Sequence, residues 1–128
     1  MEALCALIVD DSSVMRRMME RALRQAGIPL AEVVEAGNGC QALDIVRHHT
    51  VDLVLSDVNM PVMDGLEFVR QLRAMNEGRA VPVLMIPSEG SESRVPEAIA
   101  CGAQGCVRKP FTADQVKRGV LALLGHPA

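Results

Sequence analysis

The sequence predicts an α/β fold of the doubly wound type, in which helices cover both faces of a parallel five-stranded sheet. Two observations lead to this prediction. Short apolar runs alternate along the chain with amphipathic stretches, and several of those stretches begin with helix-capping residues. The length of 128 residues is that of one domain. We therefore expect a single domain over residues 1–128, with no output domain.

The five apolar runs are expected to form the strands, because each is short and aliphatic, as strands buried on both faces are. They are Leu4–Val9, Val33–Glu35, Leu53–Ser56, Val83–Ile86 and Gly105–Arg108. Five βα units in a chain of this length are typical of flavodoxin-like folds, which have the strand order 2-1-3-4-5. Ligands of such folds bind above the carboxyl ends of the strands.

The first helix is expected after the first strand, because apolar residues recur there at helical spacing. Its predicted core side carries Val14, Met15, Met18, Met19, Ala22, Leu23 and Ala26. Its opposite side carries Arg16, Arg17, Glu20, Arg21 and Arg24, and we expect most of these side chains to be solvated. Three later helix starts show the spacing of a capping box, in Asn38 with Gln41, Asp64 with Glu67, and Thr112 with Gln115.

The fourth helix is expected to be short, from about Arg94 to Cys101, because Pro96 is tolerated only in a first turn. Ser93 is its expected N-cap. The preceding residues 88–93 contain Gly90 and two glutamates, which predicts a mobile loop beside the carboxyl end of the fourth strand.

Composition argues against several functions. The formal charge is −3 and aromatic residues make up 2%, so neither a basic face nor stacking side chains favour a nucleic-acid partner. The apolar run Leu4–Val9 is too short to span a membrane, and we expect a cytoplasmic protein.

The cysteines and histidines show no metal-site spacing. Without a Cys-x-x-Cys pair, we expect buried free thiols at Cys5, Cys40, Cys101 and Cys106. His48 and His49 are interpreted as structural residues near a helix end, and His126 as part of the tail.

Four charged residues follow strands of the predicted sheet. Asp10 and Asp11 follow the first strand, Asp57 the third and Lys109 the fifth, so all four should meet at one edge. Clustered carboxylates repel one another unless a cation keeps them ionised, and hard oxygen ligands favour Mg²⁺. The sequence therefore predicts an Mg²⁺ site that can also attract a phosphate.

These residues resemble the response-regulator receiver family, in particular its stand-alone, CheY-like chemotaxis regulators. The resemblance covers essentially the whole chain and depends on three ordered motifs. They are Ile8-Val9-Asp10-Asp11 with Met15-Arg16-Arg17, Asp57-Val58-Asn59-Met60-Pro61 with Met63-Asp64-Gly65, and Lys109-Pro110-Phe111.

The resemblance implies that Asp57 accepts a phosphoryl group from a sensor histidine kinase or a small phosphodonor. Asp11 and Asp57 would bind Mg²⁺, or Mn²⁺ in its place, with Asp10 acting partly through water and Asn59 through its backbone carbonyl. Lys109 would pair with a phosphoryl oxygen, and the Lys109–Pro110 bond would be cis.

The implied function is two-component signalling. The protein would be a switch that catalyses only its own phosphorylation and dephosphorylation, not an enzyme with a separate substrate. An unidentified output protein would read the switch, and a flagellar motor switch is one candidate.

Two switch positions depart from the family pattern. Pro87 stands where a Thr or Ser is expected, and it has neither a hydroxyl nor an amide hydrogen. The neighbouring Ser88 is a candidate substitute, and Glu89 occupies a position that influences acyl-phosphate hydrolysis. Cys106 replaces the usual aromatic residue and is too small to act as a lever. We therefore expect the response to phosphorylation in residues 87–93.

Three alternatives stay open at this point. A pseudo-receiver that binds partners without being phosphorylated is favoured by Pro87. A haloacid-dehalogenase-like phosphohydrolase would also place an Asp after a strand, but Asn59 replaces its second acid. A redox switch through Cys101 and Cys106 is the third.

Overall fold

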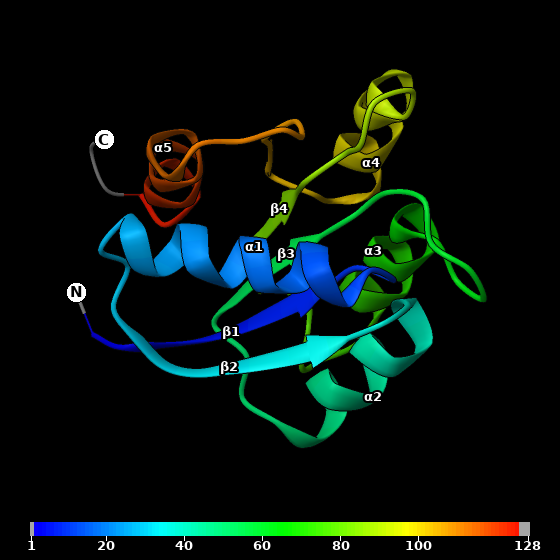
Figure 1. Cartoon of the computed structure of the whole chain (residues 1–128). Coiled ribbons are helices and arrows are strands. Elements are labelled where there is room, and N and C mark those ends of the chain that lie inside the picture. The colour runs from blue at the N-terminus through cyan, green and yellow to red at the C-terminus, as the bar shows by residue number, and fades with distance from the viewer. Residues whose placement is uncertain (1, 126–128) are drawn as a thin grey trace.

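The computed structural model describes residues 2–125 and has a five-stranded parallel sheet in the order β2-β1-β3-β4-β5 (Figure 1). The predicted fold class and strand order are confirmed. The strands are β1 (Leu4–Val9), β2 (Leu30–Ala36), β3 (Leu53–Ser56), β4 (Val83–Met85) and β5 (Gly105–Cys106). His126 lies outside the described residues.

The helices alternate with the strands along the chain. They are α1 (Ser13–Gln25), α2 (Gly39–His48), α3 (Gly65–Ala74), α4 (Val95–Cys101) and α5 (Ala113–Leu123), with a 3₁₀ turn η1 (Glu92–Arg94) before α4. His48 and His49 lie at the end of α2, as expected. None of the helices described between residues 2 and 125 is long and apolar enough to cross a membrane.

The sheet separates two aliphatic cores. On one face α2, α3 and α4 pack over a core that includes the buried Phe68 and Met85. On the other face α1 and α5 pack over Ile8, Leu84 and Ile86. Both layers of helices can be seen in Figure 1. This arrangement leaves the carboxyl ends of the strands free for polar residues.

The edge strands differ in length from the prediction. Strand β2 is longer than the predicted Val33–Glu35. Several of its residues are exposed, so only part of the strand forms an apolar run in the sequence. Strand β5 is shorter than Gly105–Arg108. The Val107 and Lys109 amides still donate to the carbonyls of Met85 and Pro87, but Pro87 has no amide to donate in return, and the ladder ends.

The three predicted N-caps are confirmed, although only one forms a complete capping box. Thr112 and Gln115 satisfy each other's backbone amides at the start of α5. Asn38 caps α2, but the Gln41 side chain accepts from the Gly37 amide instead of the cap residue.

The start of α4 differs from the prediction in one respect. Pro96 does lie in the first turn, but Ser93 is not the N-cap, because it belongs to the 3₁₀ turn and Arg94 occupies the cap position. A cap at Ser93 would have placed Pro96 third in the helix, where the amide that a cap hydroxyl accepts from is missing. Helix α4 thus begins without a side-chain cap.

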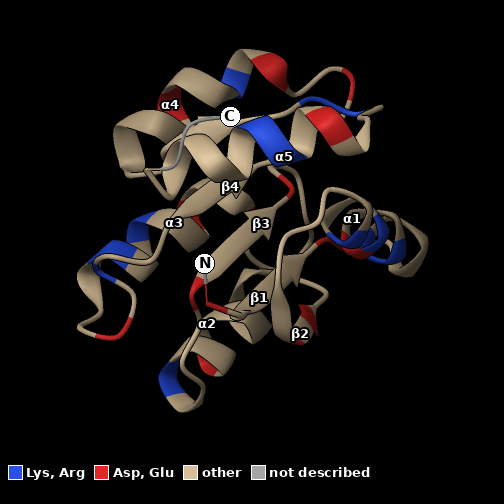
Figure 2. Ribbon diagram, turned by 90° about the vertical axis from the view of Figure 1, so that its left-hand side faces the viewer, with Lys and Arg blue, Asp and Glu red and all other residues tan. Residues whose placement is uncertain are grey.

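The expected core stripe of α1 is only partly buried. Met19, Ala22 and Leu23 are buried, whereas Val14 is 61% exposed and Met18 is 48% exposed. The helix therefore presents an outer surface on which apolar and basic side chains are mixed, and Figure 2 shows the basic residues gathered along α1.

All four cysteines are free thiols, but the prediction that they are buried was wrong for two of them. Cys5 is buried and Cys101 half-buried, while Cys40 and Cys106 are exposed. Cys40 lies in the first turn of α2, and Cys106 lies on the short edge strand β5, where few neighbours can cover a side chain.

Candidate functional site

Three carboxylates meet at the carboxyl edge of the sheet. Val9 pairs with Ser56 in neighbouring parallel strands, so the residues that follow, Asp10 and Asp57, lie side by side. Asp10, Asp11 and Asp57 each offer an oxygen, and these oxygens lie within 4.8 Å of one another. Asp10 and Asp57 are buried and Asp11 is exposed. The structure therefore brings together the acidic residues that the sequence predicted.

Lys109 reaches the same cluster from the end of β5. Its Nζ lies 2.7 Å from Asp10 Oδ2 and 3.5 Å from Asp57 Oδ1, and its side chain is only 11% exposed. The Lys109–Pro110 peptide bond that directs this segment is cis, as expected. The lysine thus provides one fixed positive charge for three carboxylates.

The charge on Asp57 remains only partly compensated. Burial raises the pKa of the Asp57 carboxyl, Lys109 lowers it and the neighbouring Asp10 raises it, so that the pKa lies above its ordinary value. One carboxylate oxygen also accepts a 2.8 Å hydrogen bond from the Val58 amide. The pocket offers hard oxygen ligands, and its buried carboxylates repel one another. Both features suit a divalent cation such as Mg²⁺.

The loop between β3 and α3 is tied to residues far away in the sequence. Asn59, whose backbone carbonyl is the expected fourth ligand, accepts a side-chain hydrogen bond from Arg94. A second nitrogen of Arg94 donates to Asp64 Oδ2 at 3.0 Å. No local signal in the sequence marks Arg94 for these contacts, because its partners lie 35 and 30 residues away along the chain.

Arg16 is also closer to the site than predicted. We expected the arginines of α1 to be mostly solvated, but the Arg16 guanidinium donates to the backbone carbonyl of Asp10 at 2.7 Å and to Glu35 at 2.8 Å. It therefore fixes the turn that carries Asp10. The position of Arg16 in the Met15-Arg16-Arg17 motif is the sequence feature that could have indicated this contact.

The switch positions lie beside the pocket. Pro87 is buried, and its carbonyl accepts from the Lys109 amide at 3.0 Å. The Ser88 hydroxyl lies 3.4 Å from the Ser91 hydroxyl, and the Ser91 hydroxyl donates to the Ser88 carbonyl at 2.8 Å. These serines close a turn, so the segment expected to be a loop contains a turn followed by η1.

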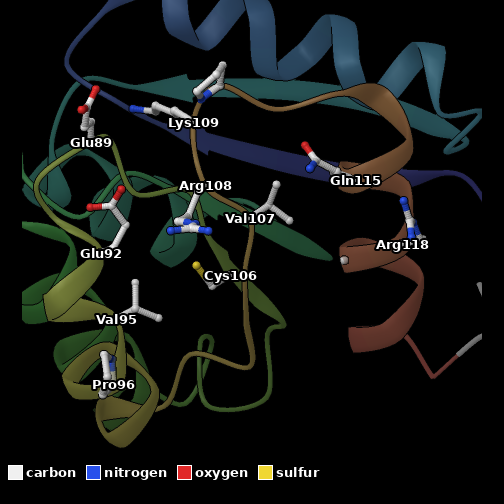
Figure 3. Close-up of a pocket in the computed structure, with 12 residues that line it drawn as sticks. Glu89, Glu92, Val95, Pro96, Cys106, Val107, Arg108, Lys109, Gln115 and Arg118 are labelled. Carbon is white, nitrogen blue, oxygen red and sulfur yellow. The ribbon is translucent and has the colours of Figure 1, made fainter.

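Cys106 opens onto a groove between α4 and α5. Figure 3 shows Val95 and Pro96 on the α4 side and Gln115 on the α5 side, with Cys106 between them. The groove has a volume of about 1100 Å³ and extends to Glu89 and Lys109. The small thiol thus leaves an open space next to the acidic pocket.

The fold and the acidic pocket are those of an α/β domain of the receiver class. The sequence of residues 6–120 matches the family model of the response regulator receiver domain, and the chain belongs to this family. Receiver domains are signalling switches and not enzymes with separate substrates. This membership also sets aside the haloacid-dehalogenase-like alternative.

Within the family the chain is similar to CheY proteins. It is 36% identical to a chemotaxis protein CheY homolog of Campylobacter jejuni over 120 residues, covering 93% of this chain and 91% of the relative. It is 38% identical to the chemotaxis protein CheY of Pseudomonas aeruginosa over 114 residues, covering 89% and 90% of the two chains. The chain is therefore a CheY-like receiver domain.

Solved structures agree with this assignment. The chemotaxis response regulator CheY4 of Vibrio cholerae superposes with a TM-score of 0.83 at 35% identity, over 95% of this chain and 99% of that one. The receiver domain of a Pseudomonas aeruginosa sensor histidine kinase superposes with a TM-score of 0.83 at 26% identity, over 97% and 99%. That structure has a magnesium ion in its active-site cleft.

Proposed function

We propose that this protein is a cytoplasmic response regulator in which Asp57 accepts a phosphoryl group from a sensor histidine kinase. The observation that supports this most is the convergence of Asp10, Asp11 and Asp57 within 4.8 Å, with Lys109 beside them. The phosphorylated domain then acts on a separate output protein. Similarity to chemotaxis regulators makes a flagellar motor switch one candidate for that partner.

The chemistry requires little from the protein beyond position and charge. An Asp57 carboxylate oxygen attacks the phosphorus atom, the phosphorus–nitrogen bond of the donor phosphohistidine breaks, and the imidazole leaves with the bonding electrons. No general base is needed, because an attacking carboxylate has no proton to remove. Lys109, held 3.5 Å from Asp57, is positioned to pair with a phosphoryl oxygen.

The carboxylates of Asp10, Asp11 and Asp57 and the backbone carbonyl of Asn59 would hold the Mg²⁺. When bound, the cation supplies positive charge that offsets the repulsion between the carboxylates and the phosphoryl oxygens. Arg16 and the Val58 amide keep Asp10 and Asp57 in place for this role.

A pseudo-receiver that is never phosphorylated is the alternative, and Pro87 is the residue that favours it. Its buried ring offers a phosphoryl oxygen no hydroxyl and no amide hydrogen. The intact acidic pocket argues against this alternative, since a pure binding module has no need to collect three carboxylates around a lysine.

Incubation with acetyl phosphate and Mg²⁺ separates the two functions. We expect the intact mass to increase by one phosphoryl group, and Asp57→Asn to abolish the increase because the nucleophile is gone. Asp114→Asn, which changes an exposed aspartate on α5, is the matched control and should be labelled like the wild type. An unlabelled wild-type protein, or equal labelling of Asp57→Asn, contradicts the proposal.

A further inference from the structure

We propose that Arg94 is a positioning residue that couples the phosphorylation site to the start of α4. It would do so by holding the β3–α3 loop, residues 57–64, against the junction of η1 and α4. The inference builds on the proposed function, because it concerns how occupancy of that site reaches the rest of the domain.

The two acceptors of Arg94 lie at opposite ends of the β3–α3 loop. One guanidinium nitrogen donates to the side-chain oxygen of Asn59, and another donates to Asp64 Oδ2 at 3.0 Å. The planar guanidinium can serve two acceptors at once, which a lysine ammonium on a single stem does less well. A single side chain therefore spans the segment that follows the phosphoacceptor.

Asp64 connects this contact to the start of α3. Its other oxygen, Oδ1, accepts from the Glu67 amide at 3.0 Å and so caps the helix. Burial raises the pKa of the Asp64 carboxyl, but the Glu67 amide and Arg94 together outweigh that effect and lower it. Asp64 thus stays ionised, and the loop is held at both of its ends.

Arg94 also stands at a weak point of its own segment. It is the last residue of η1 and occupies the N-cap position of α4, but it makes no capping hydrogen bond there. Backbone hydrogen bonds hold this junction, because the Arg94 amide donates to the Ser91 carbonyl and the Val95 amide to the Glu92 carbonyl, but the stabilisation that a side-chain cap gives is missing. A shift of Asn59 can therefore move the η1–α4 junction without breaking a side-chain cap.

This route does not need the two residues that are replaced in this chain. Pro87 offers no hydroxyl, and Cys106 has no ring to move into or out of the groove. Asn59 lies two residues after Asp57 and supplies a backbone carbonyl to the proposed Mg²⁺ site. Displacement of that carbonyl would be transmitted through the Asn59 side chain to Arg94.

The test compares variants by nuclear magnetic resonance, with and without beryllofluoride and Mg²⁺. Arg94→Met removes both hydrogen bonds and keeps most of the side-chain length, and Arg94→Lys keeps the charge near Asp64. Asp64→Ser keeps a capping oxygen for α3 but removes the carboxylate that holds Arg94. Arg79→Met is the matched control, because Arg79 is an exposed arginine that also donates to an asparagine side chain, that of Asn76.

In the wild type we expect the ligand to shift the amide signals of residues 57–60, of the loop 88–91 and of residues 92–99. In Arg94→Met the shifts at 92–99 should be lost, and Mg²⁺ should bind about threefold more weakly by calorimetry, as suits a partly exposed contact. Asp64→Ser should behave similarly, Arg94→Lys should recover part of the 92–99 response, and Arg79→Met should match the wild type.

The outcomes separate this inference from the proposed function. If the wild type binds the ligand and Arg94→Met keeps the full response at 92–99, the coupling through Arg94 is wrong while phosphorylation at Asp57 stands. If the wild type binds neither Mg²⁺ nor beryllofluoride, the proposed function fails and the coupling fails with it. Equal melting temperatures of Arg94→Met and the wild type would show that the lost response is not a loss of folding.

Discussion

Asp57 carries a negative charge in a place that does not favour it. Burial and the nearby Asp10 raise the pKa of the Asp57 carboxyl, and Lys109 offsets only part of this effect. The folded protein therefore binds a proton at Asp57 more tightly than the unfolded chain does. By linkage, the contribution of Asp57 to stability is greatest below its unfolded pKa and falls as the pH rises toward its folded pKa.

Replacing Asp57 by asparagine should accordingly stabilise the Mg²⁺-free protein at neutral pH. We expect the free energy of unfolding at pH 7 to rise by about 1 kcal/mol, because a neutral side chain of the same shape removes the buried charge. The gain should disappear near pH 3, where the carboxyl is protonated in both states. Urea unfolding followed by circular dichroism measures this, and the absence of Trp and Tyr rules out their fluorescence.

Asp114→Asn is the control for this experiment, because Asp114 is an exposed residue paired with Arg118 on α5. Its stability should change little between neutral and acidic pH. If Asp57→Asn is less stable than the wild type at pH 7, the contact between Asp57 and Lys109 outweighs the cost of burying the Asp57 charge.

The sequence was sufficient to predict the charged residues of the pocket, but not their supports. Asp10, Asp57 and Lys109 each follow an apolar strand. Because parallel strands end at the same edge of the sheet, the positions of these residues in the sequence are enough to predict that their side chains lie close together. Arg94 and Arg16 are different, because each acts through a long flexible side chain whose direction depends on tertiary packing. Nothing in the neighbouring residues sets that direction.

At the scale of elements, the start of α3 is packed closely against the backbone of Asp57. The Gly65 amide donates to the Val58 carbonyl at 2.7 Å, and a Cβ at this position would lie 2.3 Å from the Asp57 carbonyl oxygen. Gly65 does not have a positive φ, so the requirement is for close approach and not for backbone conformation. The helix can start at this place only because residue 65 has no side chain.

Gly65→Ala should therefore affect both stability and the site. Either α3 or the Asp57 backbone must move, and we expect a loss of about 3 kcal/mol in the free energy of unfolding, as for other overpacked positions. Weaker Mg²⁺ binding should accompany it. The matched control is Gly37→Ala, where a Cβ would make ordinary contacts at 3.4 Å or more. Equal stabilities of the two variants in urea would contradict this account of α3.

Elements buried on both sides were the ones predicted best. The bounds of β1 and β3 agree with the prediction, and β4 ends one residue before the predicted Ile86, because central strands of a parallel sheet form unbroken apolar runs. Edge strands have an exposed side, so the bounds of β2 and β5 were wrong at one or both ends. The Ser93 cap failed for a local reason, since Pro96 removed an amide that such a cap requires.

At the scale of the whole molecule, the site joins parts of the chain that are distant in sequence. Its side chains follow β1, β3 and β5, which lie at the centre and at one edge of the sheet between the two aliphatic cores. A small domain of this kind is expected to unfold cooperatively. A cation that binds only the assembled pocket should therefore stabilise the entire fold and not one loop.

Mg²⁺ should consequently raise the thermal stability of the protein by a calculable amount. At a free concentration ten times the dissociation constant, linkage gives about 1.4 kcal/mol, or about 5 °C in melting temperature for a domain of this size. Calorimetric scans across a Mg²⁺ titration, at constant ionic strength, measure the shift. Asp11→Asn and Asp57→Asn should lose most of it, whereas Asp114→Asn should keep it. A shift that survives the loss of Asp57 would mean that the cation stabilises the fold from another place, and the pocket would not be its binding site.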